Sequence, residues 1–149
     1  MKDRIELTDR PLDVASAIAF VTDPAAGGVA VFLGTTRQEN SADGRQLLAL
    51  DYEAYAEMAL DQMKDLAKQS RARWPIARLA LLHRTGRVGL GEPSVIIAVS
   101  SPHRGEAFEA CRWLIDTLKA QATLWKKEIW TDGTASWVHR VGGTTDRHG

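Results

Sequence analysis

The chain contains 149 residues, and its 19 lysines and arginines are balanced by 19 aspartates and glutamates. This length predicts one domain with a proper core, and the balanced charge argues against nucleic acid or a membrane surface as a partner. The single cysteine excludes an internal disulfide framework and agrees with a reducing cytoplasm, while the apolar runs are too short to span a bilayer.

The first half of the chain predicts two helices and two strands. Apolar residues at helical spacing favour helices over residues 11–21 and 56–73. Gly27-Gly28 opens an apolar strand that continues through residues 29–33, and alternation predicts a return strand over residues 47–55. The polar, turn-forming segment 34–44 is expected to be the loop between these two strands.

The second half predicts two further strands, a long helix and a hairpin. Apolar runs indicate strands over residues 76–83 and 93–100, separated by turn chemistry at 86–91. Residues 101–128 read as one helix, and residues 129–138 suggest a short hairpin around a DG turn. Strand pairs interrupted by helices argue for an α+β fold with an antiparallel or mixed sheet. We expect a single domain over residues 1–141, followed by a disordered tail over 142–149.

The helix predicted after the last long strand has a recognisable beginning. Ser101 is a good N-cap, and Pro102 suits the first helical position, where its missing N–H costs nothing. The buried stripe comprises Ala107, Phe108, Ala110, Cys111, Leu114, Ile115 and Leu118. We therefore interpret Cys111 as a small core hydrophobe and not as a nucleophile.

His103 and Arg104 fall in the first turn of this predicted helix. Cations there oppose the helix dipole, but together with free backbone amides they form a strong site for phosphate or carboxylate. The alternative is an arginine that pairs with a nearby carboxylate. Position alone leaves the two interpretations about equal.

Three lysines, Lys119, Lys126 and Lys127, follow at or beyond the end of the same helix. Each can be explained without chemistry, Lys119 as a C-terminal cap and the other two as a solvated pair. A lysine held near other cations and apolar rings is instead driven toward its neutral, nucleophilic form. The functional interpretation requires these lysines to converge on one pocket.

Three other features bear on function. Arg37 lies on the loop after a buried strand, where it could bind an anion or simply pair with Glu39. Five tryptophans, with Trp113 outside the core stripe, suggest an interface and hence a homodimer or a protein partner. No metal is expected, because the histidines lack the short spacing of a zinc site.

Four segments resemble the large, catalytic subunit of molybdopterin synthase: FLGTTRQEN, LDYEAYAEMA, RWPIARLALLHRTGRVGLGE and SSPHRGEAFEACRWLIDTLKAQATLWKKE. The likeness runs nearly continuously from about residue 28 to 137. Its most specific parts are the His-Arg pair before the helix and the K-x6-K pair that ends in WKKE.

The resemblance implies an α/β hammerhead-like fold with a mostly antiparallel sheet packed by helices. It also implies sulfur transfer to cyclic pyranopterin monophosphate, which forms the dithiolene of molybdopterin in molybdenum cofactor biosynthesis. The sulfur would come from a thiocarboxylate on the C-terminal Gly-Gly of a small ubiquitin-like subunit, with no cofactor or metal. The implied assembly is a cytoplasmic heterotetramer around a large-subunit homodimer.

Matched by motif, the resemblance makes Lys119 and Lys126 the catalytic residues. It makes Arg37, His103 and Arg104 the wall that binds the substrate phosphate, and Arg140 a further substrate contact that could reach across the dimer. Which lysine attacks and which moves protons stays open. Two alternatives remain: a non-catalytic dimeric scaffold for a ubiquitin-like tail, and another transferase acting on phosphate esters.

Overall fold

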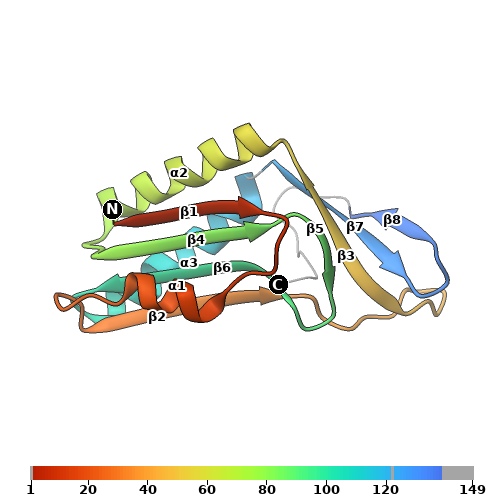
Figure 1. Ribbon diagram of the computed structural model, residues 1–149, viewed down its shortest axis with the longest axis horizontal. Coiled ribbons are helices and arrows are strands. Elements are labelled where there is room, and N and C mark those ends of the chain that lie inside the picture. Colours follow the sequence, from red (N-terminus) through yellow and green to blue (C-terminus); the bar gives the residue numbers. More distant parts are fainter. Residues whose placement is uncertain (1, 122, 139–149) are drawn as a thin grey trace.

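The computed structural model describes residues 2–121 and 123–138, which form two sheets and three helices (Figure 1). In chain order the elements are β1 (Asp3–Thr8), α1 (Val14–Val21), β2 (Gly28–Thr35), β3 (Leu47–Ala54), α2 (Ala56–Arg73), β4 (Arg78–Arg84), β5 (Gly86–Gly89), β6 (Pro93–Ser101), α3 (Arg104–Gln121), β7 (Leu124–Trp130) and β8 (Ala135–Trp137). The architecture is α+β, as predicted.

The first sheet has the strand order β1-β4-β6-β2. Its β1–β4 pair is parallel, whereas the β4–β6 and β2–β6 pairs are antiparallel. Helices α2 and α3 cover one face of this sheet and share a core with it, while α1 packs on the opposite face against β4 and β6. Alternate residues of each inner strand therefore enter two different apolar clusters, as the period of a β-strand requires.

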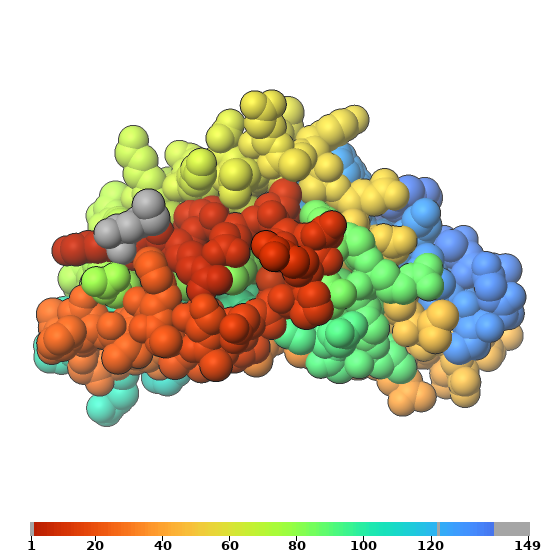
Figure 2. Space-filling model, in the orientation of Figure 1, coloured from red at the N-terminus to blue at the C-terminus, as the bar shows by residue number. Residues whose placement is uncertain are grey.

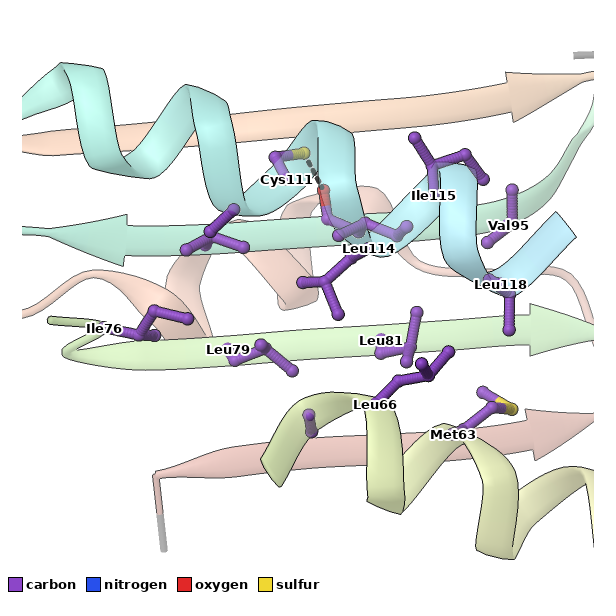
Figure 3. Close-up of a cluster of buried hydrophobic side chains, with 14 of the residues drawn as sticks. Met63, Leu66, Ile76, Leu79, Leu81, Val95, Cys111, Leu114, Ile115 and Leu118 are labelled. Carbon is purple, nitrogen blue, oxygen red and sulfur yellow. Dashed lines mark hydrogen bonds between the residues drawn. The ribbon is translucent and has the colours of Figure 1, made fainter. Parts of the chain in front are cut away.

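The larger of these clusters joins α2 and α3 to the first sheet (Figure 3). Met63 and Leu66 on α2 meet Leu81 on β4, and Leu114 on α3 lies against the same layer. Cys111 belongs to this cluster, and its Sγ donates to the Ile97 carbonyl oxygen at 3.7 Å. Burial raises the pKa of the Cys111 thiol to about 11, so the interpretation of this residue as an inert hydrophobe is confirmed.

The second sheet, with strand order β5-β3-β7-β8, is antiparallel throughout. The prediction that residues 47–55 return against residues 29–33 is wrong, because β3 pairs with β5 and β7 in this other sheet. The segment 86–91, predicted as turn, contains β5. Strand β1 was not predicted at all.

The single helix predicted over residues 101–128 is wrong at both ends. Ser101 is the last residue of β6, and its hydroxyl donates to the His103 carbonyl oxygen at 2.8 Å and does not cap the helix. Helix α3 begins at Arg104 and ends at Gln121. Beyond it, residues of LWKKEIW alternate between buried and more exposed, so Lys126 and Lys127 lie on strand β7.

The other predicted boundaries hold more closely. Helix α2 spans the residues predicted for it. Helix α1 starts at Val14, three residues later than predicted, because Asp13 caps it by accepting from the Ser16 amide at 3.0 Å. None of the helices in residues 2–121 and 123–138 is long and apolar enough to cross a membrane. The predicted disordered tail over 142–149 lies outside the described residues.

Candidate functional site

His103 and Arg104 lie together, exposed, at the start of α3. The backbone around them is closely packed. The Gly27 amide lies 3.0 Å from the Ser101 carbonyl oxygen and 3.2 Å from that of Pro102. A Cβ on Gly28 would lie only 2.9 Å from the Arg104 Cα, so the lack of a side chain there lets α3 begin against β2. An arginine, a histidine and the amides of an 18-residue helix thus meet at one place.

Lys119 is in the last turn of the same helix and is half-buried. It follows Arg104 by 15 residues, a separation of about 22 Å at the helical rise of roughly 1.5 Å per residue. Since the helix is rigid, a single copy of the chain cannot bring Lys119 and the His103–Arg104 pair onto one small substrate. The predicted residues therefore form two groups at opposite ends of α3.

Lys126 projects from the inner face of β7 and is only 9% exposed. It pairs in register with Tyr52 of β3, and buried Glu128 follows two residues later on the same face. Lys127 points the other way, with its Nζ 5.0 Å from the centre of the Trp137 ring. The solvated-pair interpretation therefore fails for Lys126, which is the buried member of the two.

Arg37 lies just beyond β2, and its side chain is 63% exposed. Its guanidinium lies 3.4 Å from Glu39 Oε1, so the local ion pair considered from the sequence is present. Strand β2 is antiparallel to β6, and α3 turns back after β6, so β2 and α3 run in the same direction. Since Gly28 meets Arg104 at one end, Arg37 belongs to the opposite end, together with Lys119.

Two hydrogen bonds link the end of β2 to Tyr52, the strand partner of Lys126. Ser94 Oγ donates to the Gly34 carbonyl oxygen at 3.2 Å, near the end of β2. The Tyr52 hydroxyl donates to Ser94 Oγ at 3.3 Å, and Tyr52 is the strand partner of Lys126. One end of the molecule thus collects Lys119, Lys126 and Arg37, while the other holds His103 and Arg104. Arg140 lies outside the described residues.

The buried end also contains His83, one of the histidines that lack the short spacing of a zinc site, and no sequence motif points to it. The His83 ring contacts the Tyr52 ring edge-on, with 5.1 Å between centroids. Desolvation lowers the pKa of His83 to about 4, and the positive charge of Lys126 acts in the same direction. The signal that could have found it is a polar residue at the end of an otherwise apolar strand. In the part of the chain that the structure describes, no group of acidic, histidine or cysteine side chains could hold a metal ion.

An open groove of about 910 Å³ lies between the end of β1, β3 and β5, and Tyr52, the strand partner of Lys126, is part of its lining. Its lining includes Thr8, Arg10, Asp51, Glu53 and Thr85, and none of the residues predicted for the site. Figure 2 shows this face of the molecule, where the N-terminal segment lies beside the β5 region. The residues predicted for the site therefore lie outside the lining of this groove, on β7 and near the ends of β2 and α3.

A family model described as "MoaE protein" matches residues 7–121, which is more than half of the chain. The chain belongs to the MoaE protein family. This MoaE-family chain is 44% identical over 133 residues to the molybdopterin synthase catalytic subunit of Thermoplasma volcanium, covering 89% of the chain and 96% of that relative. It is 42% identical over 139 residues to the same-named subunit of Nostoc sp., covering 93% of the chain and 83% of the relative.

Solved structures agree with this assignment. Molybdopterin synthase from Staphylococcus aureus superimposes on the MoaE-family chain with a TM-score of 0.85 at 31% identity, covering 91% of the chain and 97% of that structure. A complex of subunits 1 and 2 of molybdopterin-converting factor from Helicobacter pylori shares the fold, with a TM-score of 0.69, 18% identity and coverage of 93% and 90%. The resemblance found in the sequence is thereby confirmed.

Proposed function

We propose that this protein is the catalytic subunit of a molybdopterin synthase and converts cyclic pyranopterin monophosphate to molybdopterin in the cytoplasm. The sulfur comes from the C-terminal thiocarboxylate of a small ubiquitin-like subunit, and neither metal nor organic cofactor takes part. The proposal is supported by two lysines, one half-buried and one buried, that lie on either side of the short connection between α3 and β7.

The two lysines suit the two tasks of sulfur transfer. Lys119, at the surface end of α3, can hold or attack the carbonyl carbon of an incoming thiocarboxylate. Lys126, deeper on β7, can move protons as oxygen leaves the pterin and sulfur takes its place. The half-buried position of Lys119 favours its contact with a donor tail that arrives from outside. We therefore assign the contact with the donor thiocarboxylate to Lys119 and the proton role to Lys126.

His103 and Arg104 form the phosphate-binding group in this proposal. An arginine beside a histidine and free helical amides can bind a phosphate through several charge-assisted hydrogen bonds. Arg37 joins Lys119 at the other end of α3 and contributes charge where the pterin must react. Because the phosphate-binding residues and Lys119 lie at opposite ends of one helix, the complete site needs a second copy of the chain.

The free edge of the first sheet indicates where that copy binds. Strand β2 is an edge strand of the first sheet, so one of its edges has no strand partner within residues 2–121 and 123–138. Val29, Val31 and Leu33 on this strand are 43%, 38% and 40% exposed. Phe108 of α3 is 65% exposed, so its predicted place in the buried stripe is wrong, because it lies at the outer margin of that stripe. Apolar side chains grouped at an open sheet edge favour pairing with another strand.

A two-fold axis beside the middle of β2 would complete the site. Isologous pairing places two β2 strands antiparallel, so that the start of each strand lies beside the end of the other. The start of β2 is near Arg104, and its end is near Arg37 and Lys119. Each homodimer would then contain two sites. Each site would combine His103 and Arg104 of one copy with the lysines of the other. With one small subunit at each site, the assembly is a heterotetramer.

Reconstitution tests the function. The purified chain is mixed with cyclic pyranopterin monophosphate and a thiocarboxylated ubiquitin-like subunit, and the dithiolene product is followed by mass spectrometry. We expect product with the wild type, none with Lys119→Ala, and normal product with Lys68→Ala, which removes an exposed lysine from α2. Since Lys119 lies at the margin of the core, its variant should remain folded.

The same experiment separates the alternatives. Binding of the small subunit without any product would favour a non-catalytic scaffold. Binding of the pterin phosphate with turnover independent of the small subunit would favour another phosphate-ester transferase. Near-normal product from Lys119→Ala would remove this lysine from the mechanism.

Sedimentation equilibrium tests the homodimer. A glutamate at position 31 would face its counterpart near the two-fold axis, and burial of unpaired charge is strongly unfavourable. We expect Val31→Glu to shift the chain from dimer to monomer. The matched control is Leu48→Glu, at a position 47% exposed on the other sheet, which should stay dimeric. A dimeric Val31→Glu protein would place the interface elsewhere.

A further inference from the structure

His83 occupies a buried polar environment that the proposed reaction has not used. It is 6% exposed at the end of β4, and its ring packs against Tyr52, which is the register partner of Lys126. The Tyr52 hydroxyl is oriented by its bond to Ser94. The wall beside Lys126 is therefore built from two rings whose positions are fixed by strands of both sheets.

The hydrogen bonding of His83 defines its tautomer. Its Nδ1 lies 2.8 Å from the Arg84 carbonyl oxygen. Because a carbonyl oxygen can only accept, Nδ1 carries the proton, and Nε2 of the neutral ring is an acceptor. The ring is neutral at physiological pH, since burial lowers its pKa well below the usual range. His83 thus offers a lone pair without adding a second positive charge.

Such a lone pair suits a buried lysine. An ammonium group with little access to water requires hydrogen-bond acceptors, because burial of a charge is costly without them. The other charged groups nearby are Glu128, on the same face of β7, and the Arg84–Glu92 ion pair beyond His83. The His83 ring contacts the Tyr52 ring, and Tyr52 pairs in register with Lys126, so Tyr52 has both residues as neighbours. The positive charge of Lys126 accordingly acts to lower the pKa of His83.

We propose that His83 is a positioning residue for Lys126, with its Nε2 accepting a hydrogen bond from the lysine Nζ and aiming that group at the substrate. This inference rests on the proposed function, in which Lys126 moves protons during sulfur transfer. His83 touches neither substrate nor donor and acts only through the lysine. Loss of the Nε2 acceptor should therefore slow the chemical step and leave binding of the pterin phosphate largely unchanged.

Two amide substitutions separate this role from a structural one. In His83→Asn, the side-chain amide nitrogen can replace Nδ1 and keep the bond to the Arg84 carbonyl, but nothing replaces Nε2. His83→Gln places its amide near the position of Nε2 and can restore an acceptor. We expect His83→Asn to lower kcat by about 10-fold to 100-fold, the scale of a misplaced catalytic group, with KM changed by less than about twofold. His83→Gln should recover most of the lost kcat.

A purely structural His83 predicts a different result. Both variants would then unfold at lower temperature, yet the folded fraction of His83→Asn would turn over at the wild-type kcat. That outcome would overturn the proposal, as would a His83→Gln protein no more active than His83→Asn. If the wild type makes no dithiolene product, the proposed function has failed, and kinetics no longer bear on His83.

NMR on the wild-type fold provides a test that needs neither turnover nor a His83 variant. In protein labelled with ¹⁵N-histidine, we expect the His83 signals of a neutral ring protonated at Nδ1. Replacing Lys126 with Met should shift the Nε2 resonance, whereas replacing exposed Lys68 with Met should not. An Nε2 resonance that stays unchanged when Lys126 is replaced would exclude the proposed hydrogen bond between His83 and Lys126.

Discussion

Lys126 and Lys127 are adjacent in sequence, but the strand that carries them points their side chains to opposite faces. Lys126 is enclosed with Tyr52 and Glu128, while Lys127 lies over the Trp137 ring. Two adjacent lysines on one strand therefore have different surroundings. The chemical difference between them arises from burial and from neighbouring groups.

The burial of His83 should make stability depend on pH. The pKa of this residue falls from 6.5 to about 4 on folding, so the unfolded chain binds the extra proton between these values. The contribution of His83 is present above pH 6.5 and is lost as pH falls toward 4, by about 3 kcal/mol in total. Urea unfolding of the wild type and His83→Asn between about pH 7 and 4.5 should show a smaller pH slope for the variant. Equal slopes would show that His83 is already charged in the folded protein.

At the scale of elements, the sequence predicts α2 well because its apolar residues repeat at helical spacing and Trp74-Pro75 ends it. It fails at β7, where buried Lys126 and Glu128 occupy inward positions that composition suggests are solvated. Strand β1 was missed because it is half-exposed along its whole length. Site residues on α3 could be found by motif, whereas His83 depends on contacts between two sheets that no local pattern encodes.

Helix α1 has only eight residues, so its cap should matter for stability. Asp13→Ala removes the acceptor of the Ser16 amide and should lower the free energy of unfolding by about 1 kcal/mol. Asp13→Ser keeps a capping oxygen and should remain close to the wild type. Chemical denaturation measures both changes, and equal losses for the two variants would mean that the cap contributes little.

At the scale of the whole molecule, the length of α3 separates His103 and Arg104 from the lysines. This separation favours a site shared between two copies of the chain. The free edge of β2 and the exposed side chains along it lie between these two groups. In the proposed homodimer, one surface supplies both the association and the missing half of each site. Neither the sequence pattern nor the motifs reveal this arrangement, because it depends on the relative directions of β2, β6 and α3.

Subunit mixing tests the shared site. Arg104→Ala should weaken binding of the pterin phosphate by about 1.5–3 kcal/mol, and Lys119→Ala should abolish turnover. In a mixed dimer of the two variants, one site retains Arg104 from one copy and Lys119 from the other. Random exchange should therefore restore about a quarter of wild-type activity. Mixing Lys119→Ala with Lys126→Ala should restore none, since both lysines come from the same copy. No recovery in the first mixture would confine each site to a single chain.

Gly28 shows how a residue without functional groups can govern recognition. Any side chain there would collide with the backbone at Arg104, and the start of α3 would have to tilt away from the sheet. In the proposed site, the substrate phosphate would then meet a displaced Arg104 guanidinium, although every residue proposed to contact it is intact. In a survey of inherited or engineered variants, a substitution at Gly28 would show the same kinetic defect as a substitution of Arg104. Only a structure of the variant, with the start of α3 displaced, would reveal the different cause.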